Sequence, residues 1–190
     1  MKGAPLACRI ISELNTRWSW QHSKRPKLIL RGFTPEAFEA ELNAIEGYKA
    51  AEEFVHCRPY TQDEDDIASD ICAASVVIMP SMQEGFGLTA LEAIAAGIPA
   101  VITAESGIGE FLLSSGVEGV NTMAEKYIAD VIGDTNEVAE KWAKRIADIF
   151  LDQEAAFADA AFLRKALVPV LTWERAARDL SAEMEKLIED

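Results

Sequence analysis

Short apolar runs alternate with longer amphipathic segments along this sequence, and that alternation limits the fold more than any other feature. The runs are bounded by turn residues, and SVVIMPS and IPAVITA are apolar on both faces. Strands of this kind are buried on both sides, as in a parallel sheet flanked by helices. We predict strands at 27–32, 53–60, 75–81, 98–104 and, from a weaker pattern, 116–121.

The segments between and after these runs carry apolar residues at helical spacing. Thr34 is suited to an N-cap and Pro35 to the first helical position, and acids fill the first turn of the segment from Asp63, where the helix macrodipole favours them. We therefore expect an α/β fold, a Rossmann-like doubly wound parallel sheet with a helical C-terminal tail. The sequence predicts helices at 5–18, 34–45, 63–75, 135–152, 153–167 and 172–189, with another after residue 87.

Length and charge limit the classes of function. With 190 residues, 49% of them hydrophobic, the chain is long enough for one domain with a buried core and short for two, so residues 1–190 are treated as a single domain. Asp and Glu number 32 against 18 Lys and Arg, and the net charge of −14 repels a nucleic-acid backbone. Apolar runs are interrupted before they reach membrane-spanning length. We expect a cytoplasmic protein that binds no nucleic acid and has no membrane-spanning segment.

The stretch MPSMQEGFGLTALEA, residues 79–93, lies between a predicted strand and a predicted helix. In a parallel α/β sheet, ligands bind in the crevice at such strand ends. Gly85 and Gly87 let a ligand approach the backbone, and the amides that open the following helix carry a partial positive charge suited to phosphate. Glu84 and Glu92 are hydrogen-bond acceptors, which suit sugar hydroxyls. Amides and carboxylates together predict a site for a sugar nucleotide.

These residues also resemble the hallmark of a known family. The pattern is similar to that of the glycosyl transferases group 1 family, retaining enzymes of the GT-B fold whose motif has two glutamates separated by seven residues. Lys2 and Gly3 look like the end of the family's "GR…KG" element, and LTWERAARDL resembles its closing Trp-containing helix. The resemblance covers nearly the whole chain. The matching residues are Pro80-Ser81, Glu84-Gly85-Phe86-Gly87-Leu88, Leu91-Glu92-Ala93, Ala96-Gly97, Pro99 and Ser106-Gly107-Ile108-Gly109-Glu110.

The resemblance implies a role for each matching position. Glu92 is expected to bind the ribose hydroxyls, and Glu84, the catalytic candidate, to contact the donor hexose. Lys2 is expected to neutralise the diphosphate, and with the helix amides it would stabilise the leaving group without a metal or other cofactor. The residues expected to bind the nucleotide-sugar donor are Lys2, Glu84, Gly85, Phe86, Gly87, Leu88, Glu92, Ser106 and Gly107.

Each assignment has a structural alternative. Thr89 and Glu92 have the spacing of a capping box, which would explain Glu92 without a ligand. Glu84 fits a solvated loop acid, and Gly87 fits an ordinary turn. Lys2 fits an exposed terminal lysine. A further alternative is that Phe86 and Leu88 only seal the helix against the sheet.

The sequence also departs from the family. Members have two Rossmann-like domains, and the N-terminal domain supplies the acceptor site. No such domain is recognised in this chain, so we expect it to be inactive alone. The resemblance also places a central strand ending in "GR" before Lys2, and without it the strands at 27–32 and 75–81 would pair directly or leave exposed edges. The chain has Ser106 where the family has glycine and Gly109 where the family has proline. These two differences put the affinity for the donor in doubt.

Two hypotheses of function stay open. The leading one is the donor-binding half of a retaining glycosyltransferase, which moves a hexose from a nucleoside-diphosphate sugar when it is joined to an N-terminal domain. The alternative is a non-catalytic GT-B-like sensor or interaction module of a larger protein. A more distant interpretation is another GT-B enzyme, such as an epimerase or a phosphorylase. The apolar stripe of the last predicted helix, with Trp173, Leu180 and Leu187, leaves self-association open.

Overall fold

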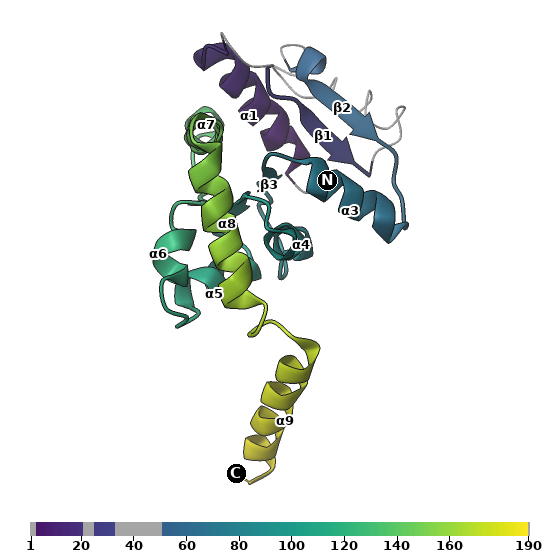
Figure 1. The fold of residues 1–190 in the computed structure, drawn as a ribbon, viewed down its shortest axis with the longest axis vertical. Coiled ribbons are helices and arrows are strands. Elements are labelled where there is room, and N and C mark those ends of the chain that lie inside the picture. The colour runs from purple at the N-terminus through teal and green to yellow at the C-terminus, as the bar shows by residue number, and fades with distance from the viewer. Residues whose placement is uncertain (1–2, 21–24, 33–50, 190) are drawn as a thin grey trace.

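A computed structural model describes residues 3–20, 25–32 and 51–189 of the chain (Figure 1). The predicted helix at 34–45 and the donor candidate Lys2 lie outside the described residues. The elements in chain order are α1 (Ala4–Arg17), β1 (Leu28–Arg31), η2 (Glu52–Phe54), β2 (Val55–Arg58), α3 (Glu64–Ala73), β3 (Val77–Met79), α4 (Leu88–Ala96), β4 (Ala100–Thr103), α5 (Gly107–Ser114), α6 (Val120–Ala124), β5 (Ile128–Ala129), α7 (Thr135–Leu151), α8 (Gln153–Leu167) and α9 (Trp173–Glu189).

The predicted helices α1, α3, α7, α8 and α9 are all present, and aspartates define the starts of three of them. Asp63 caps α3 by accepting the amide of residue 65, Asp134 caps α7 and Asp152 caps α8. A side-chain oxygen at this position satisfies an amide that the first helical turn leaves without a partner. The short polar residues between the helical segments therefore set these boundaries, which explains why they could be predicted.

The predicted strand at 116–121 is wrong. Gly116 and Gly119 both have positive φ, at 65° and 77°, and Gly119 is the N-cap of the short helix α6. Left-handed backbone ends a strand, and glycine is the residue that adopts it most readily. The strand that pairs with β4 is instead β5, two buried residues at Ile128–Ala129 that the apolar pattern did not single out.

All described strands are parallel, but they form two hydrogen-bonded sheets. β1 pairs with β2, with Leu28 opposite Val55 and Arg31 opposite Arg58. The other sheet has the order β3-β4-β5, with Val77 opposite Ala100. Of the two alternatives predicted for β1 and β3, direct pairing is therefore wrong for the described residues, and each of the two strands keeps an edge that no other described strand pairs with.

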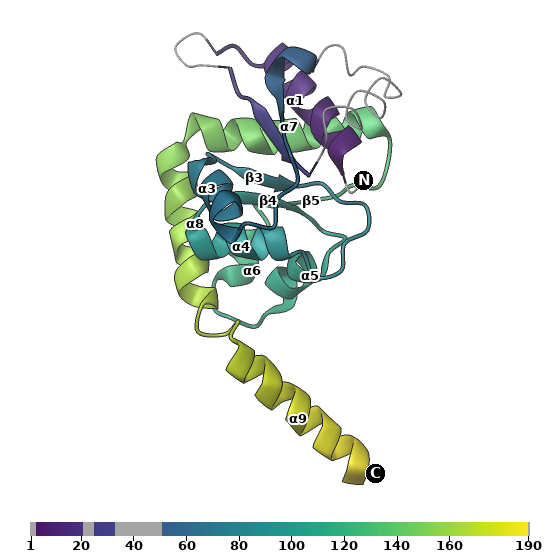
Figure 2. The ribbon, with the colours of Figure 1, turned by 90° about the vertical axis from the view of Figure 1, so that its right-hand side faces the viewer.

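Helices cover both faces of the larger sheet (Figure 2). Val101 of β4 packs into a cluster with α1 and α7, while its neighbours Ala100 and Ile102 pack into a second cluster with α4, α5, α6 and α8. Successive residues of β4 therefore point to opposite faces of the sheet, as they do in a strand that is buried on both sides. The structure thus confirms the α/β class and the two covered faces of the sheet.

The last helix, α9, extends away from this body in both views (Figures 1 and 2). The large apolar side chains that the structure describes on this helix are exposed, from 55% at Met184 to 89% at Trp173. The exposed stripe predicted on this helix is therefore present. No helix in the described part of the chain is long and apolar enough to cross a membrane.

Candidate functional site

The loop from β3 to α4 has the sharp entry into a helix that the sequence predicts. Gly87 is the N-cap of α4 and has a φ of 99°. A Cβ at this position would lie 2.8 Å from the Met79 side chain and 2.9 Å from that of Ile108. Backbone strain and lack of space both require glycine here, so Gly87 is more than an ordinary turn residue.

The same loop is joined to the start of α5 by two backbone hydrogen bonds. The amide of Gly107 donates to the carbonyl of Gly85 at 2.8 Å, and the amide of Ile108 donates to that of Phe86 at 2.7 Å. A Cβ on Gly107 would lie 2.9 Å from the Gly85 oxygen, so this close approach depends on glycine. The loop and α5 therefore form one unit. The two α5 amides are used within the protein and are not offered to a ligand.

The start of α4 is different, because its first amides have no protein partner in the described part of the chain. Ala90 and Leu91 donate to the carbonyl of Gly87, whereas no hydrogen bond links the amides of Leu88 and Thr89 to another described residue. Free amides at a helix N-terminus carry the positive end of the helix dipole and bind anions. The start of α4 can therefore accept a phosphate.

Two glutamates flank this point. Glu84 is half-buried in the loop, and Glu92 is exposed in the second turn of α4. The capping-box alternative for Glu92 is wrong, because the N-cap is Gly87 and no side chain caps this helix. Among the residues that the structure describes, no three His, Cys, Asp or Glu side chains gather as a metal site. The carboxylates can accept hydrogen bonds from hydroxyl groups.

Ser106 lies beside this unit, with its hydroxyl already engaged. Its Oγ donates to the carbonyl of Thr103 at 2.9 Å and accepts from the amide of Gly109 at 3.2 Å, so Ser106 is the N-cap of α5. A Cβ on Gly109 would lie 2.5 Å from the Thr103 oxygen. Serine directly before a helix is a recognised capping signal. That signal, which the sequence analysis missed, explains Ser106 as a structural residue at the border of the site.

Phe86 and Leu88 do not seal α4 against the sheet. Phe86 is 39% exposed and Leu88 is 65% exposed, and Met82 in the same loop is 69% exposed. The sealing alternative is therefore wrong, and the loop presents three exposed apolar side chains, those of Met82, Phe86 and Leu88. Exposed Gly85 has no atom within 4 Å of a built Cβ, so its surface is open.

Gly3 brings the start of α1 to the same place. It has a φ of 74°, and a Cβ on it would lie 2.6 Å from the carbonyl oxygen of Pro80, just after β3. This contact was not among the predicted site residues, although Gly3 belongs to the quoted resemblance. The first residue that the structure describes, Gly3, therefore lies against the end of the strand that leads into the glycine loop (Figure 1).

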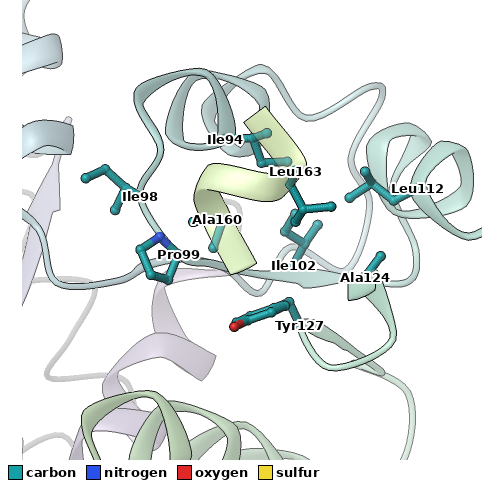
Figure 3. Close-up of a pocket in the computed structure, with 10 residues that line it drawn as sticks. Ile94, Ile98, Pro99, Ile102, Leu112, Ala124, Tyr127, Ala160 and Leu163 are labelled. Atoms are coloured by element: carbon teal, nitrogen blue, oxygen red, sulfur yellow. The ribbon is translucent and has the colours of Figure 1, made fainter. Parts of the chain in front are cut away.

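An apolar cavity in the protein does not belong to this site (Figure 3). It is lined by core side chains of α4, β4, α5 and α8, among them Ile94, Ile102 and Leu163. Tyr127 borders it and donates to Asp159 at 2.9 Å. Burial, and then the Asp159 carboxylate, raise the pKa of Tyr127. None of the predicted donor residues lines this cavity, and its lining offers little for a sugar nucleotide.

Comparison with known proteins places the chain in a family. The family described as "Family 4 Glycosyltransferase in conflict systems" matches residues 1–180. A GDP-mannose-dependent alpha-(1-6)-phosphatidylinositol dimannoside mannosyltransferase of Mycobacterium tuberculosis is 28% identical over 100 residues, 51% of this chain and 26% of its own length. An uncharacterized glycosyltransferase of Methanocaldococcus jannaschii is 28% identical over 65% of this chain and 31% of its own.

Solved structures show the same fold at lower identity. Sucrose-phosphate synthase from Thermosynechococcus elongatus has a TM-score of 0.70 at 20% identity and covers 99% of this chain. The lipopolysaccharide glycosyltransferase WaaG has a TM-score of 0.60 at 19% identity and covers 96% of it. This chain spans 43% of each of those two chains. The sequence match, the α/β fold and the glycine loop together show that the chain belongs to the family 4 glycosyltransferases of conflict systems, a branch of the group 1 enzymes with the GT-B fold.

Proposed function

We propose that this chain is the donor-binding domain of a retaining glycosyltransferase that moves a hexose from a nucleoside-diphosphate sugar to an acceptor. The acceptor site would belong to a second, N-terminal GT-B domain. In this proposal Glu92 binds the ribose, Glu84 contacts the hexose, and Lys2 and the α4 amides hold the diphosphate. No metal is required, because the amides and the lysine supply the positive charge.

The observation that carries the proposal is the unit formed by the glycine loop and α5. Two backbone hydrogen bonds hold Gly85 and Phe86 in place, and the surface at Gly85 stays open. The α4 amides next to it suit phosphate, and exposed Glu92 suits a diol. Amides that suit a phosphate and a carboxylate that suits hydroxyl groups thus lie close together in the sequence. A sugar nucleotide is a ligand that carries both kinds of group.

A second candidate, a non-catalytic GT-B-like sensor or interaction module, is favoured by the start of α5. The amides of Gly107 and Ile108 donate to loop carbonyls, and Ser106 caps the helix. A second helix N-terminus at the site is therefore closed to phosphate. A site with fewer free amides would bind a diphosphate more weakly, which suits sensing or vestigial binding better than turnover.

Calorimetric titration with UDP, GDP and ADP and their glucose conjugates tests the proposal. We expect one base to bind, and Glu92→Ala to weaken that binding by about 2 kcal/mol, roughly 30-fold, because a carboxylate that accepts two hydroxyl groups is lost. The matched control is Glu185→Ala, which removes another exposed helical glutamate, on α9. It should leave affinity unchanged.

The outcomes separate the candidates. Binding that is lost with Glu92→Ala and kept with Glu185→Ala supports a donor site. If Glu92→Ala binds the nucleotide as tightly as the unchanged chain does, the proposed role of Glu92 is contradicted. If the folded chain binds none of the six compounds, the donor proposal fails for this chain and the interaction module is favoured.

A further inference from the structure

Thr89 is an exposed residue in the first turn of α4, and it is not among the predicted donor residues. The capping box considered for Thr89 and Glu92 is absent, because the N-cap of α4 is Gly87 and no side chain caps this helix. The Thr89 side chain therefore neither starts the helix nor packs in the core, and its hydroxyl group has no structural role of that kind.

Two helical hydroxyl groups elsewhere in the protein bond to the backbone of their own helix. Thr16 in α1 and Ser114 in α5 each donate, at 2.8 Å, to the carbonyl four residues earlier. This carbonyl, or the one three residues earlier, is the usual partner of a threonine or serine hydroxyl in a helix. For Thr89, the carbonyl four residues earlier belongs to Gly85, in the loop ahead of α4.

The loop leaves the Thr89 hydroxyl without this usual partner. The carbonyl of Gly85 accepts from the amide of Gly107 at 2.8 Å, and the carbonyl of Phe86 accepts from that of Ile108 at 2.7 Å. The two carbonyls within reach of a hydroxyl at position 89 are thus both bonded to α5. In the part of the chain that the structure describes, the Thr89 side chain has no hydrogen-bond partner.

The hydroxyl adds a third donor to the first turn of α4. The amides of Leu88 and Thr89 form no hydrogen bond to another described residue, and such amides favour an anion. A hydroxyl group can rotate its O–H toward an acceptor. Two backbone donors and one side-chain donor therefore belong to two successive residues, and a phosphate oxygen accepts from either kind.

Thr89 and Glu92 lie on the same side of α4. They are three residues apart, and at this spacing the Cβ atoms of a helix are about 5–6 Å from each other. Both residues are exposed. One ligand that contacts both must carry a phosphate and hydroxyl groups within about that distance. In a nucleotide, the ribose and the phosphate bonded to it meet this condition.

We propose that Thr89 is a further binding residue of the donor site, whose hydroxyl donates a hydrogen bond to the phosphate bonded to the ribose. This role rests on the proposed function, in which Glu92 holds the ribose. The amides of Leu88 and Thr89 contact the same diphosphate. Thr89 thereby determines which of the two phosphates lies beside α4, because the ribose at Glu92 is one helical turn away.

Calorimetric titration of Thr89→Val tests this role, since valine keeps the shape of threonine and removes the hydroxyl. The ligands are the nucleoside diphosphate that the unchanged chain binds among UDP, GDP and ADP, its monophosphate and its nucleoside, with the weaker two measured by competition. We expect the affinity for the diphosphate and that for the monophosphate each to fall about tenfold, because a hydrogen bond to a charged group is lost. The affinity for the nucleoside should not change.

Two further variants separate the hydroxyl from the fold. Thr89→Ser keeps the hydroxyl and should retain most of the affinity. The matched control is Thr135→Val, at an exposed threonine in the first turn of α7, where Asp134 caps the helix. It should leave the affinity for all three ligands unchanged. Urea unfolding of each variant shows whether α4 and its surroundings stay folded.

The outcomes distinguish this role from the proposed function. Full affinity of Thr89→Val for both nucleotides would overturn the role of Thr89 and leave the donor site standing. A loss for the diphosphate alone would overturn the assignment to the phosphate bonded to the ribose. An equal loss for the nucleoside would show an indirect effect through the helix and would also overturn it. If the unchanged chain binds none of the three diphosphates, the proposed function fails, and the role of Thr89 fails with it.

Discussion

The glycine loop after β3 and the β1–β2 pair lie in one α/β protein but are held by different interactions. Backbone hydrogen bonds from Gly107 and Ile108 hold the loop, and several glycines approach other backbone atoms closely. The β1–β2 pair is tied to α3 by charge, because Arg31 and Arg58 both pair with Asp70 of that helix. The difference predicts opposite sensitivities. One added carbon should disturb the loop unit strongly, whereas the β1–β2 pair should respond to the loss of charge.

The largest effect is expected for Gly109→Ala, in the unit that holds the loop. The new methyl would lie 2.5 Å from the backbone oxygen of Thr103, which cannot move without shifting β4. We expect the free energy of unfolding to fall by about 2–3 kcal/mol, the upper part of the usual range for overpacking. Urea unfolding, monitored by circular dichroism, measures this change in the free energy of unfolding. A loss below about 0.5 kcal/mol would show that backbone contacts do not hold this region.

A smaller effect is expected for Asp70→Asn, in the β1–β2 pair. Asp70 is 14% exposed and faces two guanidinium groups, so the neutral amide keeps the shape and leaves two like charges without a counter-ion. We expect a loss of about 1–2 kcal/mol in the free energy of unfolding.

The matched control for this change is Asp148→Asn. Its pair with Lys144 is exposed on both sides, and such pairs contribute less than about 0.5 kcal/mol. Equal results for the two aspartates would show that the ion pairs of Asp70 stabilise the β1–β2 pair no more than an exposed pair stabilises a helix. Raising the salt concentration to about 1 M should reduce the effect at Asp148 more than that at Asp70, because partly buried pairs are screened less than exposed ones.

The sequence predicts those parts of this molecule that local chemistry determines. Aspartate caps and apolar spacing are local, so α3, α7 and α8 were predicted almost to the residue. The glycine loop was also found, since glycines between two glutamates form a contiguous pattern. Its sharp entry into α4 at Gly87 follows from a single residue.

The rest depends on contacts between distant segments, which no local pattern contains. Nothing near Gly109 indicates that it must pack on Thr103, or that Gly107 donates to Gly85. The strand predicted at 116–121 failed because two glycines there adopt positive φ. β5 was missed because two residues are too few to show a period. The roles of Glu84, Glu92 and Lys2 in binding stay predictions.

The smallest effect on stability, at Gly85→Ala, gives the sharpest test within the loop itself. Gly85 accepts from Gly107 through its backbone, has no positive φ, and would place its Cβ in open space. Alanine should therefore change the free energy of unfolding by less than about 0.5 kcal/mol. If the donor lies against this backbone, the same methyl should still weaken nucleotide-sugar binding by about tenfold, or 1.4 kcal/mol. Unchanged binding would place the ligand away from Gly85, and a large loss of stability would mean that the space around it is filled. Because Gly109→Ala and Gly85→Ala add the same group, their difference separates the glycine that packing requires from the glycine that a ligand requires.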